Sequence, residues 1–189
     1  MVSELSQRCA TRRHQQRHQR LRMLIVLAFR FGLRRDEILG LRQVDIDLQG
    51  IGRLYVRAYD GHPLKTSFSR RSLPIAPLLG ELERQWLKDL HDSVDTALAP
   101  LFPHHERDTL PRQAIQFLRQ VSGDESLKLH HLRHSFASLL TLKVVLARHP
   151  RWMAAFDSKT VAALALDSAP SLLGTLLKPD NASGDFIAI

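Results

Sequence analysis

The chain has 189 residues, a length that suits one compact domain with at most a small appendage. Hydrophobic residues make up 44% and charged residues 24%, which are ordinary globular values and argue against disorder. The single cysteine, Cys9, excludes a disulfide framework and a cysteine-rich zinc site. The longest wholly apolar run, Met23 to Phe29, is too short to cross a bilayer, and residues 1–22 lack the apolar segment of a signal peptide.

The net charge narrows the class of partner. Lys and Arg number 27 and Asp and Glu 19, which gives +8. Such a surface favours a polyanion, most simply nucleic acid. A membrane surface is a weaker alternative, because no basic amphipathic helix lies beside an exposed aromatic face. We therefore expect a cytoplasmic protein, nucleoid-associated when bound to DNA, with no membrane partner.

The first half of the chain combines helices with a small sheet. Residues 1–20 are strongly basic, and we interpret them either as a solvated lead-in or as a DNA-contacting arm. An apolar period predicts a helix from Gln15 to Gly32, and a short helix follows over residues 36–41. Alternation over residues 53–59 predicts a strand, and residues 71–75 can return beside it until Pro74 ends the pairing. Residues 43–75 are thus expected to hold a hairpin or a three-stranded sheet.

The second half is predicted to be helical. Leu79, Leu82, Trp86 and Leu90 form one apolar stripe. Pro111 opens another helix, whose inner side carries Ala114, Leu118 and Val121. Residues 132–140 mark a third helix and residues 158–166 a fourth, whereas residues 178–184 are loop-like. The expected fold class is mainly α with a small antiparallel β-sheet (α+β).

Three basic clusters carry the candidate chemistry, at residues 32–47, 65–74 and 130–137. Arg34, at a helix junction, can donate two hydrogen bonds to a phosphate. His130 and Arg133 are three residues apart, so a helix places them on one face near its N-terminus, where anions bind well. Lys65 lies beside a turn and can donate a proton or contact a phosphate. Two arginines, a histidine and a lysine suit a phosphodiester whose charge grows in the transition state, with no metal or cofactor.

Each of these residues also has a simpler interpretation. Arg34 alone is an ordinary surface arginine, and Lys65 alone is a solvated charge on a hairpin. His130, His131 and His134 have the i, i+4 spacing of metal ligands, which would make the chain a metal-dependent nuclease. No HExxH glutamate accompanies them, however, and an arginine among them repels a cation. We therefore predict no metal site.

Together the three clusters resemble one family. GLRxxE at residues 32–37, a hairpin lysine followed by RRxLP at 70–74, and HxLRHSFA at 130–137 are similar in order to the catalytic domain of tyrosine recombinases, also called phage-type integrases. The resemblance spans about residues 21–140. It implies that domain's fold over residues 21–189, with residues 1–20 as the lead-in and no separate N-terminal core-binding domain. It also implies double-stranded DNA as partner and other recombinase subunits as candidate partners.

The resemblance further implies a role for each matched residue. Arg34 and Arg133 clamp the scissile phosphate, Lys65 protonates the leaving 5′ oxygen, and His130 assists proton transfer. Glu37 orients its neighbours, with a simple helix-start charge as the alternative. Family members attack phosphorus with a tyrosine near the C-terminus and form a 3′-phosphotyrosyl link. Six further basic residues of the motifs and of the lead-in are expected to contact DNA: Arg12, Arg13, Arg35, Arg70, Arg71 and His134.

The family's third motif, LGH followed by the nucleophilic tyrosine, has no clear counterpart. Tyr55 and Tyr59 both precede the HxLRH motif. The nearest match, at residues 166–171, puts Asp167 at the family histidine and Leu176 at the tyrosine; the alternative is a chain that stops before the true motif. We therefore predict an integrase-like DNA-binding domain that is cleavage-deficient as given, and whether it is an enzyme stays open. The alternatives are a non-catalytic DNA-binding remnant or regulator, the metal-dependent nuclease, and a basic interaction module with no DNA role.

Overall fold

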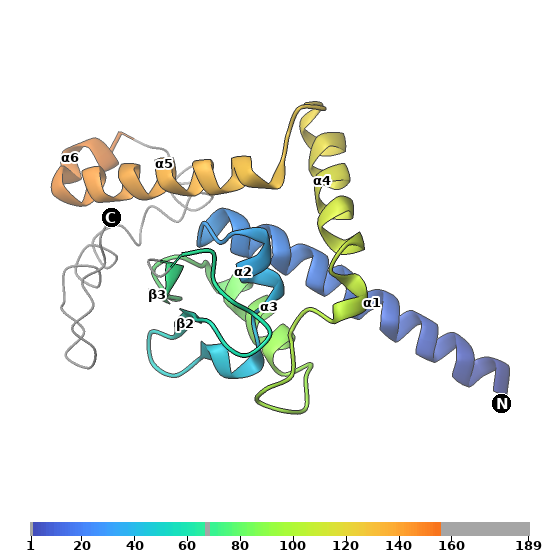
Figure 1. The fold of residues 1–189 in the computed structure, drawn as a ribbon. Helices are drawn as coiled ribbons and strands as arrows, with labels where there is room; N and C mark the ends of the chain where they lie inside the picture. Colours follow the sequence, from blue (N-terminus) through green and yellow to red (C-terminus); the bar gives the residue numbers. More distant parts are fainter. Residues whose placement is uncertain (1, 67–68, 156–189) are drawn as a thin grey trace.

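Helices make up most of the described chain, residues 2–66 and 69–155 of a computed structural model (Figure 1). In chain order the helices are α1 (Val2–Arg30), α2 (Arg35–Leu39), α3 (Glu81–His91), α4 (Thr109–Ser122), α5 (Leu129–Arg148) and α6 (Pro150–Met153). The strands β1 (Ile46–Asp47), β2 (Arg53–Val56) and β3 (Arg71–Pro74) form one antiparallel sheet in the order β1-β2-β3. This architecture confirms the predicted fold class, mainly α with a small antiparallel sheet.

Helix α1 is the central element, and α2, α3, α4 and α5 all contact it. The sequence predicts it only from Gln15, because the residues before that point show no apolar period. In the structure the helix begins at Val2, and Figure 1 shows its N-terminal part extending away from the other helices. Polar contacts hold the stretch that follows: Arg20 donates two hydrogen bonds of 2.6 Å to Glu106, just before α4.

Helix α1 ends at Arg30, close to the Gly32 that the sequence predicts as its end. Gly32 has φ +60°, a left-handed conformation that glycine adopts without a steric penalty. A Cβ atom placed on Gly32 would lie 2.3 Å from Phe136 Cδ1 on α5. The glycine therefore lets α5 pack directly against the turn that joins α1 to α2.

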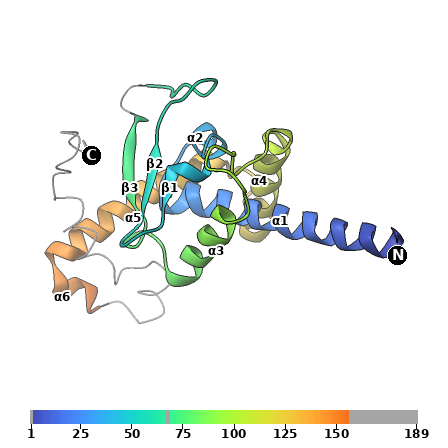
Figure 2. The ribbon, with the colours of Figure 1, turned by 90° about the horizontal axis from the view of Figure 1, so that it is seen from below.

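The sheet buries one face, and its strands are shorter than predicted. Leu54 of β2 pairs with Ile46 on one side and with Leu73 on the other, and all three are buried. Figure 2 shows the three strands side by side. Strand β2 ends at Val56, because the chain then folds into a turn in which the backbones of Tyr59 and His62 exchange two hydrogen bonds. Pro74 ends β3, as predicted.

Two of the predicted inner faces are partly wrong. Leu82 is 63% exposed, since α3 begins only at Glu81 and turns Leu87 and Leu90 into the core instead. On α4, Ala114 is buried but Val121 is 70% exposed. Figure 1 shows that α4 projects away from α1 beyond its first turns, which agrees with the exposure of Val121 near the end of the helix.

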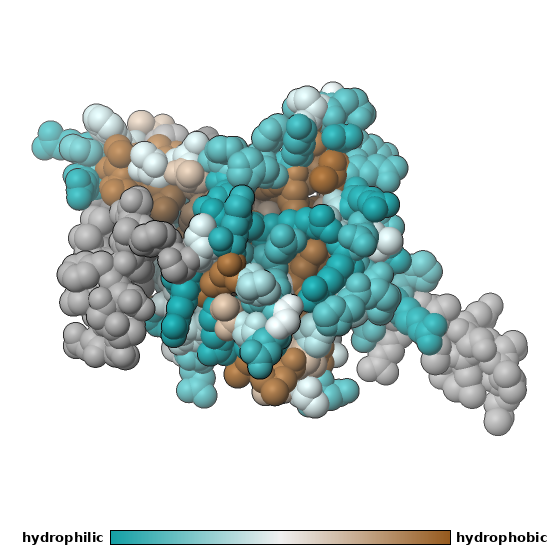
Figure 3. Space-filling view, viewed as in Figure 1, coloured by the Kyte–Doolittle hydropathy of each residue, from teal (hydrophilic) through white to brown (hydrophobic). Residues whose placement is uncertain are grey.

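Helix α5 is longer than the stretch predicted at residues 132–140. Helix α6 follows it, and no apolar period in the sequence predicts this helix. The predicted helix at 158–166, the predicted loop at 178–184 and the positions Asp167 and Leu176 lie outside the described residues. No described helix has both the length and the apolar character that a membrane crossing requires. Figure 3 shows hydrophilic residues over most of one face, with hydrophobic patches where α4 and α5 lie.

The close approach at Gly32 gives a stability prediction. We expect Gly32→Ala to lower the free energy of unfolding by about 2–4 kcal/mol, because the new methyl group adds a clash with Phe136 to the cost of a left-handed residue. Gly123→Ala is the matched control, since Gly123 has φ +71° but open space around it; it should lose only about 1–2 kcal/mol. Urea denaturation followed by circular dichroism measures both, and equal losses would contradict the packing argument.

Candidate functional site

The N-terminus of α2 is closed by Arg34 and Glu37. Arg34 is the residue that precedes the helix, and its backbone N–H donates to Glu37 Oε2 at 2.9 Å. Its guanidinium Nη1 donates to the other oxygen, Oε1, at 3.0 Å. A glutamate three residues after the cap satisfies a backbone N–H that the helix end leaves unpaired. The spacing of the GLRxxE motif therefore places Arg34 beside a carboxylate by local structure alone.

Glu37 also binds Arg71, which comes from β3. Arg71 Nη2 donates to Oε2 at 2.8 Å and Nη1 to Oε1 at 3.2 Å, and the Glu37 side chain is only 4% exposed. Burial by itself raises the pKa of this carboxyl, but the hydrogen bonds and charges of Arg71 and Arg34 outweigh it, so the pKa lies below its ordinary value of 4.5. Glu37 is therefore ionised at neutral pH and joins two arginines from different elements.

Arg133 reaches the same place from the start of α5. Its Nη1 donates a hydrogen bond to the carbonyl oxygen of Gly32, two residues before Arg34. Burial lowers the pKa of the Arg133 guanidinium below its ordinary value; the positive charges of Arg34 and Arg71 lower it further, and the charge of Glu37 opposes them. We call Arg34, Arg71, Arg133 and Glu37 the arginine cluster.

His130 lies one helical turn before Arg133 on α5. Loss of hydration lowers the pKa of His130 below its ordinary value of 6.5. Electrostatic interactions with four neighbouring groups lower it further: His134, Arg133, His131 and Arg34. The ring of His130 also meets that of His134 edge to face, with centroids 4.6 Å apart. His130 is thus neutral at neutral pH and lies beside the arginine cluster.

Lys65 is exposed in the connection between β2 and β3. Its neighbour Thr66 lies 3.0 Å, hydroxyl to hydroxyl, from Ser69, and the same Ser69 oxygen accepts a hydrogen bond from Arg34 Nη1 at 3.2 Å. The structure therefore brings Arg34, Arg133 and His130 together and links the Lys65 turn to them through Ser69. The roles expected for these four residues stay predictions.

The residues expected to contact DNA fall into different surroundings. Arg71 is engaged by Glu37 and only 21% exposed, so it faces its partner rather than solvent. Arg35 is half exposed and pairs with Asp108 at 2.9 Å. Three further members are exposed: Arg13, Arg70 and His134. The side chain of Arg12 lies outside the described part of the chain.

Both tyrosines of the chain lie in or near β2. The Tyr59 hydroxyl donates to the carbonyl oxygen of Gly40 at 2.8 Å, and the Arg42 guanidinium lies 3.8 Å from the centre of its ring. Burial raises the pKa of Tyr59 above its ordinary value of 10.0, so the phenol stays protonated. Tyr55 is half-buried within β2. Tyr59 is therefore held by structural contacts.

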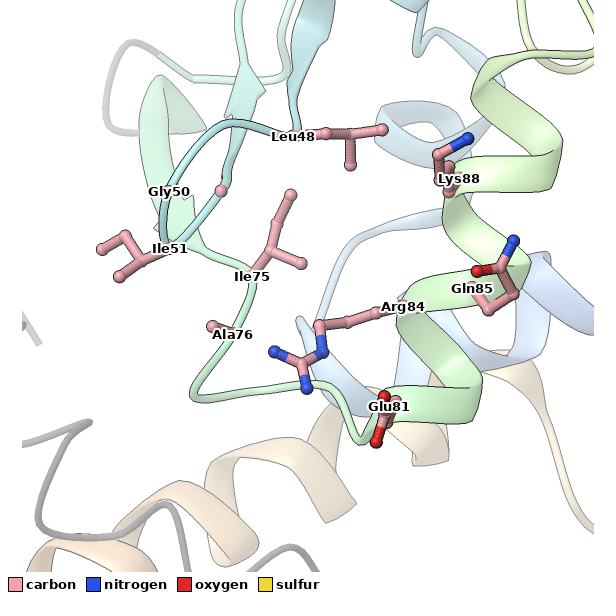
Figure 4. A pocket seen from close by; sticks show the side chains of 10 residues that line it. Leu48, Gly50, Ile51, Ile75, Ala76, Glu81, Arg84, Gln85 and Lys88 are labelled. Carbon is pink, nitrogen blue, oxygen red and sulfur yellow. The ribbon is translucent and has the colours of Figure 1, made fainter.

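A surface depression lies away from the arginine cluster. It has a volume of about 380 Å³ and lies between α3 and the loops that flank the sheet. Figure 4 shows Arg84 reaching from α3 toward Ala76 across it. None of Arg34, Lys65, His130 and Arg133 lines it. Among residues 2–66 and 69–155, no group of three or more histidine, cysteine, aspartate or glutamate side chains could hold a metal ion.

Sequence reasoning missed how Arg71 and Ser69 take part. Both belong to the basic stretch 65–74, which charge alone marks as a DNA contact. The available signal was the glutamate of GLRxxE, a carboxylate with more hydrogen-bonding capacity than one arginine uses. The pairing with Arg71 depends on the sheet placing β3 next to α2, which a local pattern does not specify.

The Glu37 carboxylate should contribute much more to the free energy of unfolding than the carboxylate of the neighbouring Asp36. We expect Glu37→Gln to lower the free energy of unfolding by about 2–4 kcal/mol at pH 7, because it leaves Arg34 and Arg71 repelling each other. The folded pKa of Glu37 is depressed, so its contribution is full above about pH 4.5 and is lost as the pH falls through the folded value. Asp36→Asn, an exposed neighbour, is the control and should cost less than about 0.5 kcal/mol. Urea denaturation at several pH values tests this, and a Glu37→Gln effect that persists unchanged in acid would contradict it.

The family of the chain follows from a match that covers most of these elements. The model of the phage integrase family matches residues 2–148, more than half of the chain. No curated protein and no solved structure matches the chain significantly. The match spans all three sequence motifs and confirms the resemblance to tyrosine recombinases. The chain belongs to the phage integrase family.

Proposed function

We propose that this integrase-family chain binds duplex DNA and holds one backbone phosphate between Arg34 and Arg133. The observation that carries the proposal is the arginine cluster itself: Arg133 bonds to Gly32, 101 positions away in sequence, beside Arg34. Guanidinium groups repel one another, so their convergence needs an anion that compensates them. Glu37 supplies one negative charge against three positive ones, which leaves the cluster with an excess that a phosphate matches.

The chemistry of the neighbouring groups supports a phosphodiester as the ligand. The side chain of Arg34 is 37% exposed, so a phosphate can reach it. His130 has a lowered pKa and can accept a proton or donate a hydrogen bond at neutral pH. Lys65 is exposed on the turn linked to Arg34 and would donate a proton to the leaving 5′ oxygen, the role that the family resemblance implies. Other recombinase subunits are candidate partners of the bound complex.

We propose further that the chain as given does not cleave DNA. Covalent transfer needs a phenol in line with the leaving oxygen. The Tyr59 hydroxyl is occupied by the Gly40 carbonyl and its pKa is raised, which opposes its use as a nucleophile. Tyr55 belongs to the paired strand β2. The same observation favours a second candidate function, a DNA-binding regulator that performs no chemistry.

DNA affinity should depend on salt through the arginine cluster. We expect binding to a short duplex to weaken steeply between about 50 and 200 mM salt, because phosphate contacts release counterions. Arg34→Gln and Arg133→Gln should each reduce the slope of log affinity against log salt by about one. Arg84→Gln, an exposed arginine on α3, is the matched control and should leave the slope unchanged. Equal slopes for all three variants would refute the phosphate clamp, and no binding at low salt would favour the interaction module.

The proposed lack of cleavage is tested with a nicked suicide duplex. We expect no covalent protein–DNA adduct on a denaturing gel, whereas a family member with its tyrosine nucleophile traps one on its own substrate. Tyr55→Phe and Tyr59→Phe should leave DNA affinity within about twofold, since neither phenol contacts the phosphate. An adduct mapped by mass spectrometry to any residue of the unmodified chain would overturn the prediction and identify the nucleophile.

A further inference from the structure

Ser69 is a buried hydroxyl at the junction between the Lys65 turn and the arginine cluster. The residue is only 3% exposed. Its Oγ accepts a hydrogen bond from Arg34 Nη1 at 3.2 Å and lies 3.0 Å from Thr66 Oγ1. A hydroxyl can accept one hydrogen bond while it exchanges another with a second hydroxyl, so both contacts form at once. Ser69 is therefore a direct link between the residue after Lys65 and Arg34.

The main chain of Ser69 is held as firmly as its side chain. Its carbonyl oxygen accepts a hydrogen bond from Arg71 Nη1 at 2.8 Å, and its N–H donates to the carbonyl oxygen of Thr66 at 3.0 Å. Arg71 is in turn fixed by two hydrogen bonds to Glu37. Ser69 thus has no freedom to move away from Arg34 without breaking contacts to the cluster. Thr66 is exposed, and its hydroxyl forms a hydrogen bond with the Ser69 hydroxyl, so this pair holds Thr66 in place.

We propose that Ser69 is a positioning residue that sets Lys65 against the same phosphate that Arg34 binds. This inference rests on the proposed phosphate clamp and adds to it the link between the clamp and its lysine. An unanchored lysine on a hairpin samples many positions and gains little from one phosphate, because ordering its long side chain costs entropy. An anchored turn removes part of that cost before DNA arrives.

A double-mutant cycle on DNA affinity tests the link, because positioning makes two effects interdependent whereas a purely structural role leaves them additive. The four proteins are wild type, Lys65→Ala, Ser69→Ala and the double variant, titrated with a short fluorescent duplex at fixed low salt. We expect Lys65→Ala to weaken wild-type binding by about fivefold and the Ser69→Ala background by less than about twofold. Ser69→Thr keeps the hydroxyl and should restore the full effect of Lys65→Ala.

Ser72→Ala, three residues further along the chain on β3, is the matched control. It removes a hydroxyl that accepts a hydrogen bond from Arg53, outside the cluster, and should be additive with Lys65→Ala. If Ser69→Ala does not fold, Thr66→Val cuts the same link from its exposed side and completes the cycle. Additive effects of Ser69→Ala or Thr66→Val with Lys65→Ala, or no effect of Lys65→Ala on wild type, would overturn this inference alone. Loss of affinity in Arg34→Gln decides the phosphate clamp separately.

Discussion

The Glu37 carboxylate accepts hydrogen bonds from the guanidiniums of Arg34 and Arg71 while almost no water reaches it. A buried carboxylate stays ionised only when cations compensate its charge, because removing an unpaired charge from water costs roughly several kcal/mol. One side chain therefore joins the start of α2 to β3. The hydrogen bonds of Arg34 and Arg71 to Ser69 extend this link to the end of the β2–β3 connection.

The charge balance of the cluster explains why its arginines are both held and available. Glu37 is close enough to orient Arg34, but it leaves that side chain partly open to solvent. Arg133 has lost part of its hydration and faces Arg34, so its pKa is lowered and its charge is only partly compensated. Glu37 thus leaves an excess of positive charge in the arginine cluster beside a neutral His130, and the proposed phosphate would compensate that excess.

Sequence reasoning succeeded where the signal was local. The turn at Gly32, the carboxylate of Glu37 in the first turn of α2 and the end of β3 at Pro74 each follow from a few neighbouring residues. It failed where packing between distant elements decides the outcome. Leu82 and Val121 fit an apolar period but lie exposed, because the start of α3 and the direction of α4 are set by contacts with α1. The pairing of Arg71 with Glu37 is likewise not predictable from its charge, since a basic run does not reveal a buried partner; its predicted contact with DNA stays a prediction.

Local sequence signals and the packing of distant elements bear differently on function. An arginine beside a helix start is a weak signal alone, whereas three motifs in the family's order predict the family that the match over residues 2–148 confirms. Where α5 meets the turn after α1, Gly32 allows the helix to approach, and Arg133 is then near enough to bond to the backbone beside Arg34. A residue chosen for small size and a residue chosen for charge thus serve the same geometry. A Cβ atom at Gly32 would clash with Phe136, so the absence of a side chain at this turn lets the helix that carries Arg133 lie directly against it.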